Sequence, residues 1–458
     1  MNSSDIGMDL ACDGMQNIPS NDPRALRCDI VVGTRPEAIK LAPVVKALRE
    51  RGDDFRVRVV TSGQHGEICN SALAAFGLTP DSALDIRPIS GSLTDSASDV
   101  LRAFGRRFTD SRPDLILVQG DTTTAMAAAL AGFYAQIPVA HVEAGLRSGD
   151  LANPFPEVAN RQIIDAVSTI LLPPTPQAQA NLLQVGFTAE RCPVTGNTVV
   201  DALQLLCATH APVLDGSGVE ETELDGRRLI LLTTHRRESW GGDLEAICSA
   251  IHEIVQRRAN VIVALPVHPN PNVQRPVCQL LGGHPRIKLL PPLSYIPFLA
   301  LMRRAYLILT DSGGVQEEAP SLGVPVLVLR KTTERPEAAE AGLARIIGTD
   351  RNAIVEHVEE LLEDEQAYRQ MATAINPYGD GLASERIVEV LRNWRAGRPL
   401  LAEERSFSRR LRLTTTPQDS QKRLPTVAKD IGLFSDAKRM SRAVWPHAAS
   451  ATTKPIVP

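Results

Sequence analysis

Short apolar runs alternate with amphipathic stretches along most of the chain. The first half contains five β-rich runs, each followed by a segment with helical spacing: "CDIVVG", "RVRVVTSG", "LILVQG", "IPVAHVEAG" and "STILLPP". Apolar strands that alternate with helices are typical of α/β domains with a doubly wound parallel sheet. The pattern therefore predicts an α/β domain over residues 28–196.

A second series of the same kind follows a polar, glycine-containing stretch at Leu214–Arg228. Its apolar runs are "LILLTTH", "VIVALPVH", "IKLLPPL", "YLILTDSGG" and "VPVLVLR". We assign this series to a second domain at residues 197–379, so the chain is expected to form two Rossmann-like domains that face each other across a cleft. Residues 380–396 have the spacing of one more amphipathic helix, which the pattern alone does not assign to either domain.

The two ends of the chain do not continue this alternation. Residues 1–27 are polar and irregular, and residues 397–458 are rich in basic side chains without sustained periodicity. Such composition is typical of disordered segments, and we expect disorder at both ends, with a basic interaction tail as the alternative for the second.

Composition excludes several classes of function. The chain has 49 Lys and Arg against 53 Asp and Glu, so no global charge points to nucleic acid or to an anionic membrane. Its seven cysteines form no C-x-x-C pair, which argues against a metal cage and a disulfide framework. No apolar run approaches the ~20 residues of a membrane span, and the opening residues lack the pattern of a secretory signal. We expect a cytoplasmic protein without a membrane span.

An acidic residue follows one of the predicted strands directly. In "VQGDTTTAMAAAL", Asp121 lies between the run ending at Val118 and an alanine-rich helix. Ligands of open α/β sheets bind at the carboxyl ends of the strands, so Asp121 is a candidate for chemistry there. The alternative is that Asp121 only caps a helix.

Two segments are candidate anion sites. In "GTRPEAIKLAP", Arg35 and Lys40 flank a helix start, where the helix dipole and two cations favour a phosphate. In "DSGGVQEEAP", three residues open another helix with accessible N–H groups, and Glu318 is placed to accept ribose hydroxyls. Those three residues are Ser312, Gly313 and Gly314, and Arg335 adds a cation downstream. Two such sites suggest one long ligand, and a nucleotide diphosphate sugar has that shape.

Further polar residues lie beside predicted strand ends. Glu143, Glu157 and His235 join Asp121 as candidates for acid–base work, and Asn160 and Arg161 accompany Glu157. Each of these residues singly is also compatible with a cap or an ion pair. His65 and His268 are weaker candidates, assigned to binding only.

Eight motifs in this order closely resemble the bacterial non-hydrolysing UDP-N-acetylglucosamine 2-epimerases. They are "GTRPEAIK", "QGDTTT", "HVEAGLRSGD", "PFPEVANR", "VTGNTVVDAL", "HRRES", "DSGGVQEEAP" and "TTERPE", and the likeness runs from Cys28 to Arg395. The resemblance implies the glycosyltransferase B type architecture, a homodimer, and a final helix that crosses back to the first domain. It also implies interconversion of UDP-GlcNAc and UDP-ManNAc without NAD or metal, and hence no cofactor.

The family motifs assign roles residue by residue. The positions implied to be catalytic are Asp121, Glu143, Glu157 and His235. Those implied to hold UDP are Arg35, Lys40, His235, Ser312, Gly313, Gly314 and Glu318. Residues matching Gln64, His65 and His268 are associated with the substrate or with a second, allosteric UDP-GlcNAc. Two departures from the family pattern are Val158, where a second glutamate is common, and Lys331, where an aspartate is common.

The chemistry of C2 constrains the mechanism. Its proton is too weakly acidic for a protein base until UDP departs from C1, so we expect elimination to a 2-acetamidoglucal and re-addition of UDP. Such an activity would feed cell-surface polysaccharide synthesis. Four alternatives remain open: a 2-epimerase of another UDP-linked N-acetyl sugar (a diacetamido uronic acid or a deoxysugar), a hydrolysing epimerase, a glycosyltransferase, and a non-catalytic UDP-sugar sensor.

Overall fold

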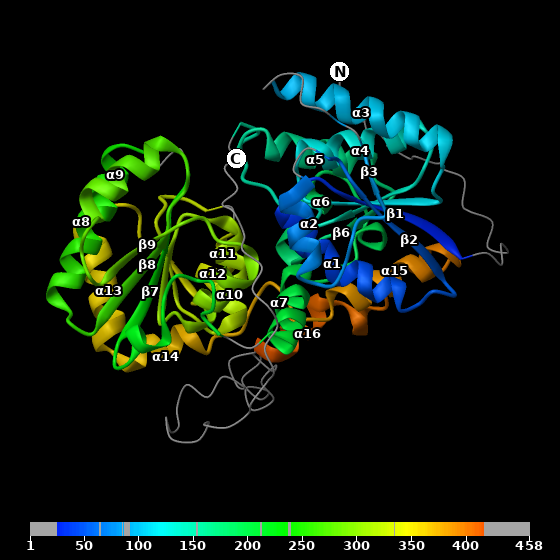
Figure 1. The fold of residues 1–458 in the computed structure, drawn as a ribbon. Coiled ribbons are helices and arrows are strands. Elements are labelled where there is room, and N and C mark those ends of the chain that lie inside the picture. Colours follow the sequence, from blue (N-terminus) through cyan, green and yellow to red (C-terminus); the bar gives the residue numbers. More distant parts are fainter. Residues whose placement is uncertain are drawn as a thin grey trace, which may run out of the picture.

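The chain forms two α/β domains that lie side by side (Figure 1). The computed structural model describes residues 25–63, 66–84, 86, 92–152, 154–210, 213–236, 240–333 and 335–415. Each domain contains one six-stranded sheet, and every strand pairing is parallel. The predicted fold class, two Rossmann-like domains of the glycosyltransferase B type, is confirmed.

The N-terminal sheet has the strand order β3-β2-β1-β4-β5-β6. Its strands are β1 (Leu26–Val32), β2 (Phe55–Thr61), β3 (Ser82–Ala83), β4 (Leu115–Gln119), β5 (Val139–Val142) and β6 (Ile170–Leu172). Successive apolar residues of a strand face opposite sides, so Ile30 and Val31 belong to different core clusters. Both faces of this sheet are therefore covered, which explains the continuous apolar runs in the sequence.

Helices cover the two faces of the N-terminal sheet (Figure 1). One face carries α3 (Leu93–Asp110), α4 (Thr123–Tyr134) and α5 (Glu157–Val167), and the other α1 (Arg35–Arg49), α2 (Gly66–Ala74), α7 (Thr198–Thr209) and α15 (Ala383–Arg395). Beside β6 lie α6 (Pro176–Gln184) and the short η1 (Ala189–Arg191). No helix within the described ranges has the length and apolar character needed to cross a membrane.

The C-terminal sheet repeats the design with the order β12-β11-β10-β7-β8-β9. Its strands are β7 (Arg228–Thr233), β8 (Val261–Pro266), β9 (Ile287–Leu290), β10 (Leu307–Thr310), β11 (Val326–Val328) and β12 (Ala344–Ile346). One face packs on α8 (Gly242–Arg257), α9 (Pro271–Leu281), α13 (Arg351–Glu363) and α14 (Glu365–Ala372). The other face packs on α10 (Tyr295–Arg304), α11 (Gly313–Glu318), η4 (Ala319–Leu322) and α12 (Pro336–Glu340). The short η2 (Glu221–Leu224) precedes β7.

The boundary between the domains lies later in the chain than expected. We placed it before residue 197, but α7 packs on α1 and α15 of the N-terminal domain. The helix α15 also packs on α1, so the chain returns to the N-terminal domain after the second sheet (Figure 1). One apolar cluster includes residues of both domains and runs through α7. The two domains therefore share part of their core.

The segment after α15 also differs from the expectation. Disorder was expected from residue 397, yet residues 397–415 contain η5 (Glu403–Arg405) and α16 (Phe407–Thr415). The Phe407 side chain is fully buried, and its backbone N–H donates to the Val194 carbonyl oxygen over 3.1 Å. Residues 1–24 and 416–458, where the other expectations of disorder fall, lie outside the described residues.

Candidate active site

One face of α5 carries charged side chains at helical spacing. Glu157, Arg161 and Asp165 are four residues apart, so they line up along the helix. Arg161 and Asp165 are buried, and Glu157 is partly buried. Buried charged side chains need charged or hydrogen-bonding partners. We therefore expect the partners of these three side chains at the carboxyl ends of the neighbouring strands.

Arg161 joins two of the predicted catalytic carboxylates. Its Nη2 lies 2.5 Å from Asp121 Oδ2 and 3.3 Å from Glu143 Oε1. Asp121 follows β4 and Glu143 follows β5, so the parallel sheet brings both to one edge. Burial alone would lower the pKa of Arg161, but the charges of Asp121 and Glu143 raise it above its ordinary value. The guanidinium therefore stays charged and holds the two carboxylates together.

Glu143 occupies an unusual backbone conformation. Its φ is +67°, in the left-handed region that side-chain-bearing residues seldom adopt, at a cost of about 1–3 kcal/mol. This turn directs its carboxylate to Gln119 Nε2, which donates over 2.9 Å, and to the buried Lys40. The strain and the converging donors place the Glu143 carboxylate firmly at the sheet edge.

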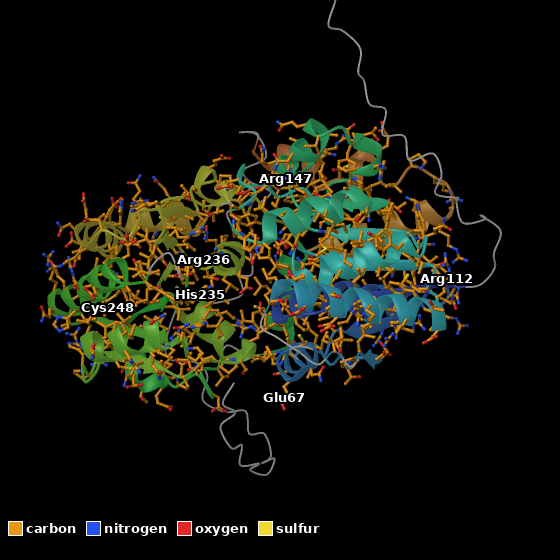
Figure 2. The ribbon with its side chains drawn as sticks, turned by 90° about the horizontal axis from the view of Figure 1, so that it is seen from above. Glu67, Arg112, Arg147, His235, Arg236 and Cys248 are labelled. Atoms are coloured by element: carbon orange, nitrogen blue, oxygen red, sulfur yellow. The ribbon has the colours of Figure 1, made fainter. Side chains whose placement is uncertain are left out.

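Glu157 is the third carboxyl group at this edge. Burial, with the nearby charge of Asp121, raises its pKa above the ordinary value, although Arg236 and Arg161 act in the opposite direction. Arg236 belongs to the C-terminal domain, where Figure 2 shows it with His235. Glu157 therefore retains a proton more readily than an ordinary glutamate, and the charge of Arg236 in the opposite domain acts on it.

Lys40 differs from its expected role as a phosphate ligand. It is 7 % exposed and pairs with Glu143 in its own domain and with Glu317, 2.8 Å away, in the other. Glu317 also pairs with Arg335 over 2.5 Å. Two carboxylates thus compensate the charge of Lys40, and the Arg335 cation is engaged as well. Lys40 therefore connects the two domains, whereas Arg335 pairs with Glu317 within the C-terminal domain.

The N-terminus of α11 is the candidate nucleotide site. Ser312 caps this helix, and Gly313 and Gly314 form its first turn. At the other end of α11, Glu318 is buried, and burial together with the adjacent Glu317 raises its pKa to about 7. Arg35 from the N-terminal domain donates to the Leu293 carbonyl oxygen over 3.4 Å. The site therefore lies where both domains meet.

His235 is oriented by a buried acid. Its Nδ1 lies 3.0 Å from Asp311 Oδ1, while 42 % of its side chain is exposed. Burial opposes ionisation of Asp311, but the hydrogen bond and charge of His235 hold the pKa of this carboxyl below its usual range. The ring of His268 stacks on His235 at a centroid distance of 6.2 Å, and burial with the His235 charge lowers the pKa of His268.

The structure brings most of the predicted residues into two groups, one on each domain. Asp121, Glu143 and Glu157 form the first. His235, His268 and the residues of α11 form the second. Gln64 and His65 lie outside the described residues.

From the sequence, no role was expected for Arg161, Glu317 or Asp311. In the structure, each of them forms an ion pair with a predicted site residue: Arg161 with Glu143, Glu317 with Lys40, and Asp311 with His235. The signal for Arg161 was present as the four-residue spacing of charged residues from Glu157 to Asp165. Glu317 carried no such signal, because its partner Lys40 lies in the other domain.

The chain matches the model of the family described as UDP-N-acetylglucosamine 2-epimerase over residues 46–392. It is 49 % identical over 367 residues to a UDP-N-acetylglucosamine 2-epimerase of Yersinia pestis, covering 79 % of this chain and 97 % of that protein. A relative of the same name from Escherichia coli K12 is 45 % identical over 376 residues, with the same coverages.

Solved structures agree with this assignment. The UDP-GlcNAc 2-epimerase from Neisseria meningitidis, bound to UDP-GlcNAc, has a TM-score of 0.74 at 40 % identity and covers 80 % of this chain and 99 % of its own. A Listeria monocytogenes structure described as a UDP-N-acetylglucosamine 2-epimerase has a TM-score of 0.75 at 43 % identity, covering 81 % and 96 %. Because the family model spans most of the chain and several relatives exceed 40 % identity, this protein belongs to the UDP-N-acetylglucosamine 2-epimerase family.

Proposed function

We propose that this protein interconverts UDP-N-acetylglucosamine and UDP-N-acetylmannosamine by inverting C2 of the sugar. The observation that carries the proposal is the pair of Asp121 and Glu143 held by Arg161, with Glu157 on the same helix as Arg161, in a protein whose other domain offers a helix terminus at Ser312. A glycosyltransferase or a passive sensor needs the helix terminus but not three converging carboxyl groups. The family membership supports the same activity.

The first half of the reaction is an elimination. The bond between C1 and the diphosphate oxygen breaks, and UDP leaves with the electron pair. A carboxylate takes the C2 proton, and the C–H electrons form the C1–C2 double bond of a 2-acetamidoglucal. Asp121, ion-paired and acceptor-only, suits the base, whereas Glu157, whose pKa is raised, suits the acid.

The second half reverses these steps on the other face. Glu157 delivers a proton to C2, positive charge develops at C1, and the UDP oxygen adds back there. Glu143 stabilises this charge from its fixed position. The partly exposed His235, backed by Asp311, holds the departed diphosphate with Arg35. Ser312, whose own N–H donates to Thr310 Oγ1, binds the phosphates together with the N–H groups of Gly313 and Gly314, and Glu318 accepts the ribose hydroxyls.

We further propose a homodimer in the cytoplasm that supplies an activated sugar for cell-surface polysaccharide. Gln64, His65 and His268 are proposed to contact the substrate or a second, activating UDP-GlcNAc. His268 supports this role through its stacking on His235. The proposal includes no cofactor, because the elimination route needs neither a redox step nor a metal.

A substrate panel followed by proton and phosphorus NMR tests the activity. We expect UDP-GlcNAc to give UDP-ManNAc without stoichiometric release of free UDP. Faster turnover of a UDP-linked diacetamido uronic acid or deoxysugar would keep the chemistry and change the substrate. Release of free ManNAc would indicate a hydrolysing enzyme, and binding without turnover would indicate a sensor.

A further inference from the structure

The motif "HVEAGLRS" contains two residues that the proposed reaction does not use. His141 in β5 and Arg147 after it both contact Asp165 of α5. His141 Nδ1 lies 2.7 Å from Asp165 Oδ1, and Arg147 Nη2 donates to Asp165 Oδ2 over 2.7 Å. His141 is fully buried, and the Asp165 side chain is 1 % exposed. Figure 2 shows Arg147 in the N-terminal domain, near its border with the other domain.

The second ring nitrogen of His141 reaches the main chain of the active site. Its Nε2 lies 2.7 Å from the carbonyl oxygen of Gly120. A carbonyl oxygen only accepts hydrogen bonds, so Nε2 carries a proton. Burial opposes ionisation of Asp165, but His141 and Arg147 hold the pKa of its carboxyl below the usual range. The buried ring thus bridges the Asp165 carboxylate and the Gly120 carbonyl oxygen.

Gly120 directly precedes Asp121. Its φ of +74° turns the chain out of β4, and the hydrogen bond from His141 to its carbonyl oxygen fixes this turn. Asn160 Nδ2 donates to the Asp121 carbonyl oxygen over 3.0 Å, and Arg161 holds the carboxylate. The position of Asp121 thus depends on the contact of His141 with the preceding residue, Gly120, and on two contacts from α5.

We propose that His141, Asp165 and Arg147 form a positioning triad, in which the His141 ring holds the Gly120 carbonyl and thereby aims the Asp121 carboxylate. The proposal rests on the proposed function, since it assigns Asp121 the role of base. The triad acts on the geometry of the base and lies outside the candidate nucleotide site of the other domain. Its loss should therefore lower kcat while leaving UDP affinity and KM unchanged.

Kinetics of three variants test this separation. We expect His141→Gln and Asp165→Asn to lose about 10²-fold in kcat, because small displacements of a catalytic group have effects of this size. Arg147→Gln should lose less, since Arg147 is only the outer partner and also donates to the Leu146 carbonyl oxygen. The matched control is His252→Gln, a partly buried histidine on α8 of the other domain.

The hydrogen bond from the ring is tested on the wild-type protein by nitrogen NMR of labelled histidine. We expect a ring Nε2–H signal that exchanges slowly with water, because His141 is fully buried and its Nε2 lies 2.7 Å from the Gly120 carbonyl oxygen. This signal should disappear in His141→Gln. Should that variant not fold, the signal should shift in Arg147→Gln, whose side chain is 14 % exposed and better tolerated.

Two results overturn the triad. One is an active wild-type protein in which no slowly exchanging His141 Nε2–H is found. The other is unchanged kcat for Asp165→Asn and Arg147→Gln relative to His252→Gln. A wild-type protein that does not epimerise UDP-GlcNAc instead overturns the proposed function, and the positioning role falls with it, whatever the NMR shows.

Discussion

Lys40 Nζ of the N-terminal domain lies 2.8 Å from Glu317 Oε2 of the C-terminal domain, and both side chains are buried. The same ammonium group contacts Glu143 at the carboxylate site, whereas Glu317 lies on α11 beside the ribose candidate Glu318. Burial opposes the charge on Glu317, yet Arg335 and Lys40 lower the pKa of this carboxyl to about 2. This ion pair therefore connects the nucleotide helix to the acid–base residues.

Removing the charge of Glu317 is expected to weaken both stability and turnover. Glu317→Gln removes the buried carboxylate that Lys40 and Arg335 share, and breaking such a pair lowers the free energy of unfolding by about 3 kcal/mol or more. Because Lys40 then has only Glu143 as its carboxylate partner, kcat should fall more than KM rises. Thermal unfolding and steady-state kinetics measure the two effects. Glu340→Gln on the exposed face of α12 is the control, and equal behaviour of both variants would contradict the coupling.

Binding and chemistry are expected to be separable at Asp121 and Glu157. Asp121→Asn and Glu157→Gln should each lose at least ~10²-fold in kcat, the usual effect of removing a general acid or base, while UDP binds as before. Calorimetric titration with UDP and a turnover assay check this. Asp110→Asn, at the exposed end of α3, should behave as wild type. Near-normal turnover of Asp121→Asn would leave Asp121 as a structural cap.

Affinity for the nucleotide sugar is expected to depend on the ionisation of Glu318. The pKa of this acid is raised to about 7, so its ionised fraction, the form that accepts two ribose hydroxyls best, grows as pH rises through 7. Between about pH 6 and pH 8 the ionised fraction increases roughly tenfold, and the affinity should rise with it. UDP-GlcNAc is the suitable probe because its diphosphate diester does not titrate in this range.

The matched variant isolates this effect. Glu318→Gln should bind UDP-GlcNAc more weakly and with a flatter pH dependence than wild type, since the amide does not ionise. Parallel pH profiles for the two proteins would show that another group causes the change and that Glu318 does not accept the ribose hydroxyls in its charged form.

Two truncations test the role of α16. A chain ending at Thr415 should keep the activity and stability of the full protein, because the sequence of residues 416–458 is polar and lacks sustained periodicity. A chain ending at Leu401 lacks Phe407. The ring of Phe407 is fully buried and packs against Arg386 of α15. Loss of a buried aromatic side chain costs about 3–5 kcal/mol, so the shorter chain should unfold at a lower temperature. Equal stability of both truncations would contradict this account.

The parts of the structure that the sequence predicted are those that depend on local patterns. Apolar runs such as Leu115–Val118 identify strands because both faces of the sheet are buried. Asp121 and Glu143 were predicted to lie together because parallel strands end at one edge of the sheet. Local pattern was sufficient here, because strand order within a doubly wound sheet follows known rules.

The features that the sequence did not predict depend on distant pairs. The partner of Lys40 is more than 270 residues away, so a lysine beside a helix start suggested a phosphate ligand instead. Phe407 is one apolar residue in a basic segment, and its burial depends on Val194 and Arg386. The role of His141 required knowledge of which acceptor faces each ring nitrogen.

The most direct test of the central claim, elimination and re-addition with acid–base work by Asp121 and Glu157, is the fate of the hydrogen at C2. UDP-GlcNAc is incubated with the protein in D₂O, and both nucleotide sugars are examined by proton NMR. We predict that the UDP-ManNAc formed carries deuterium at C2 and that recovered UDP-GlcNAc acquires it as the reaction reverses. Retention of the original hydrogen at C2, together with a strict requirement for NAD, would contradict the account.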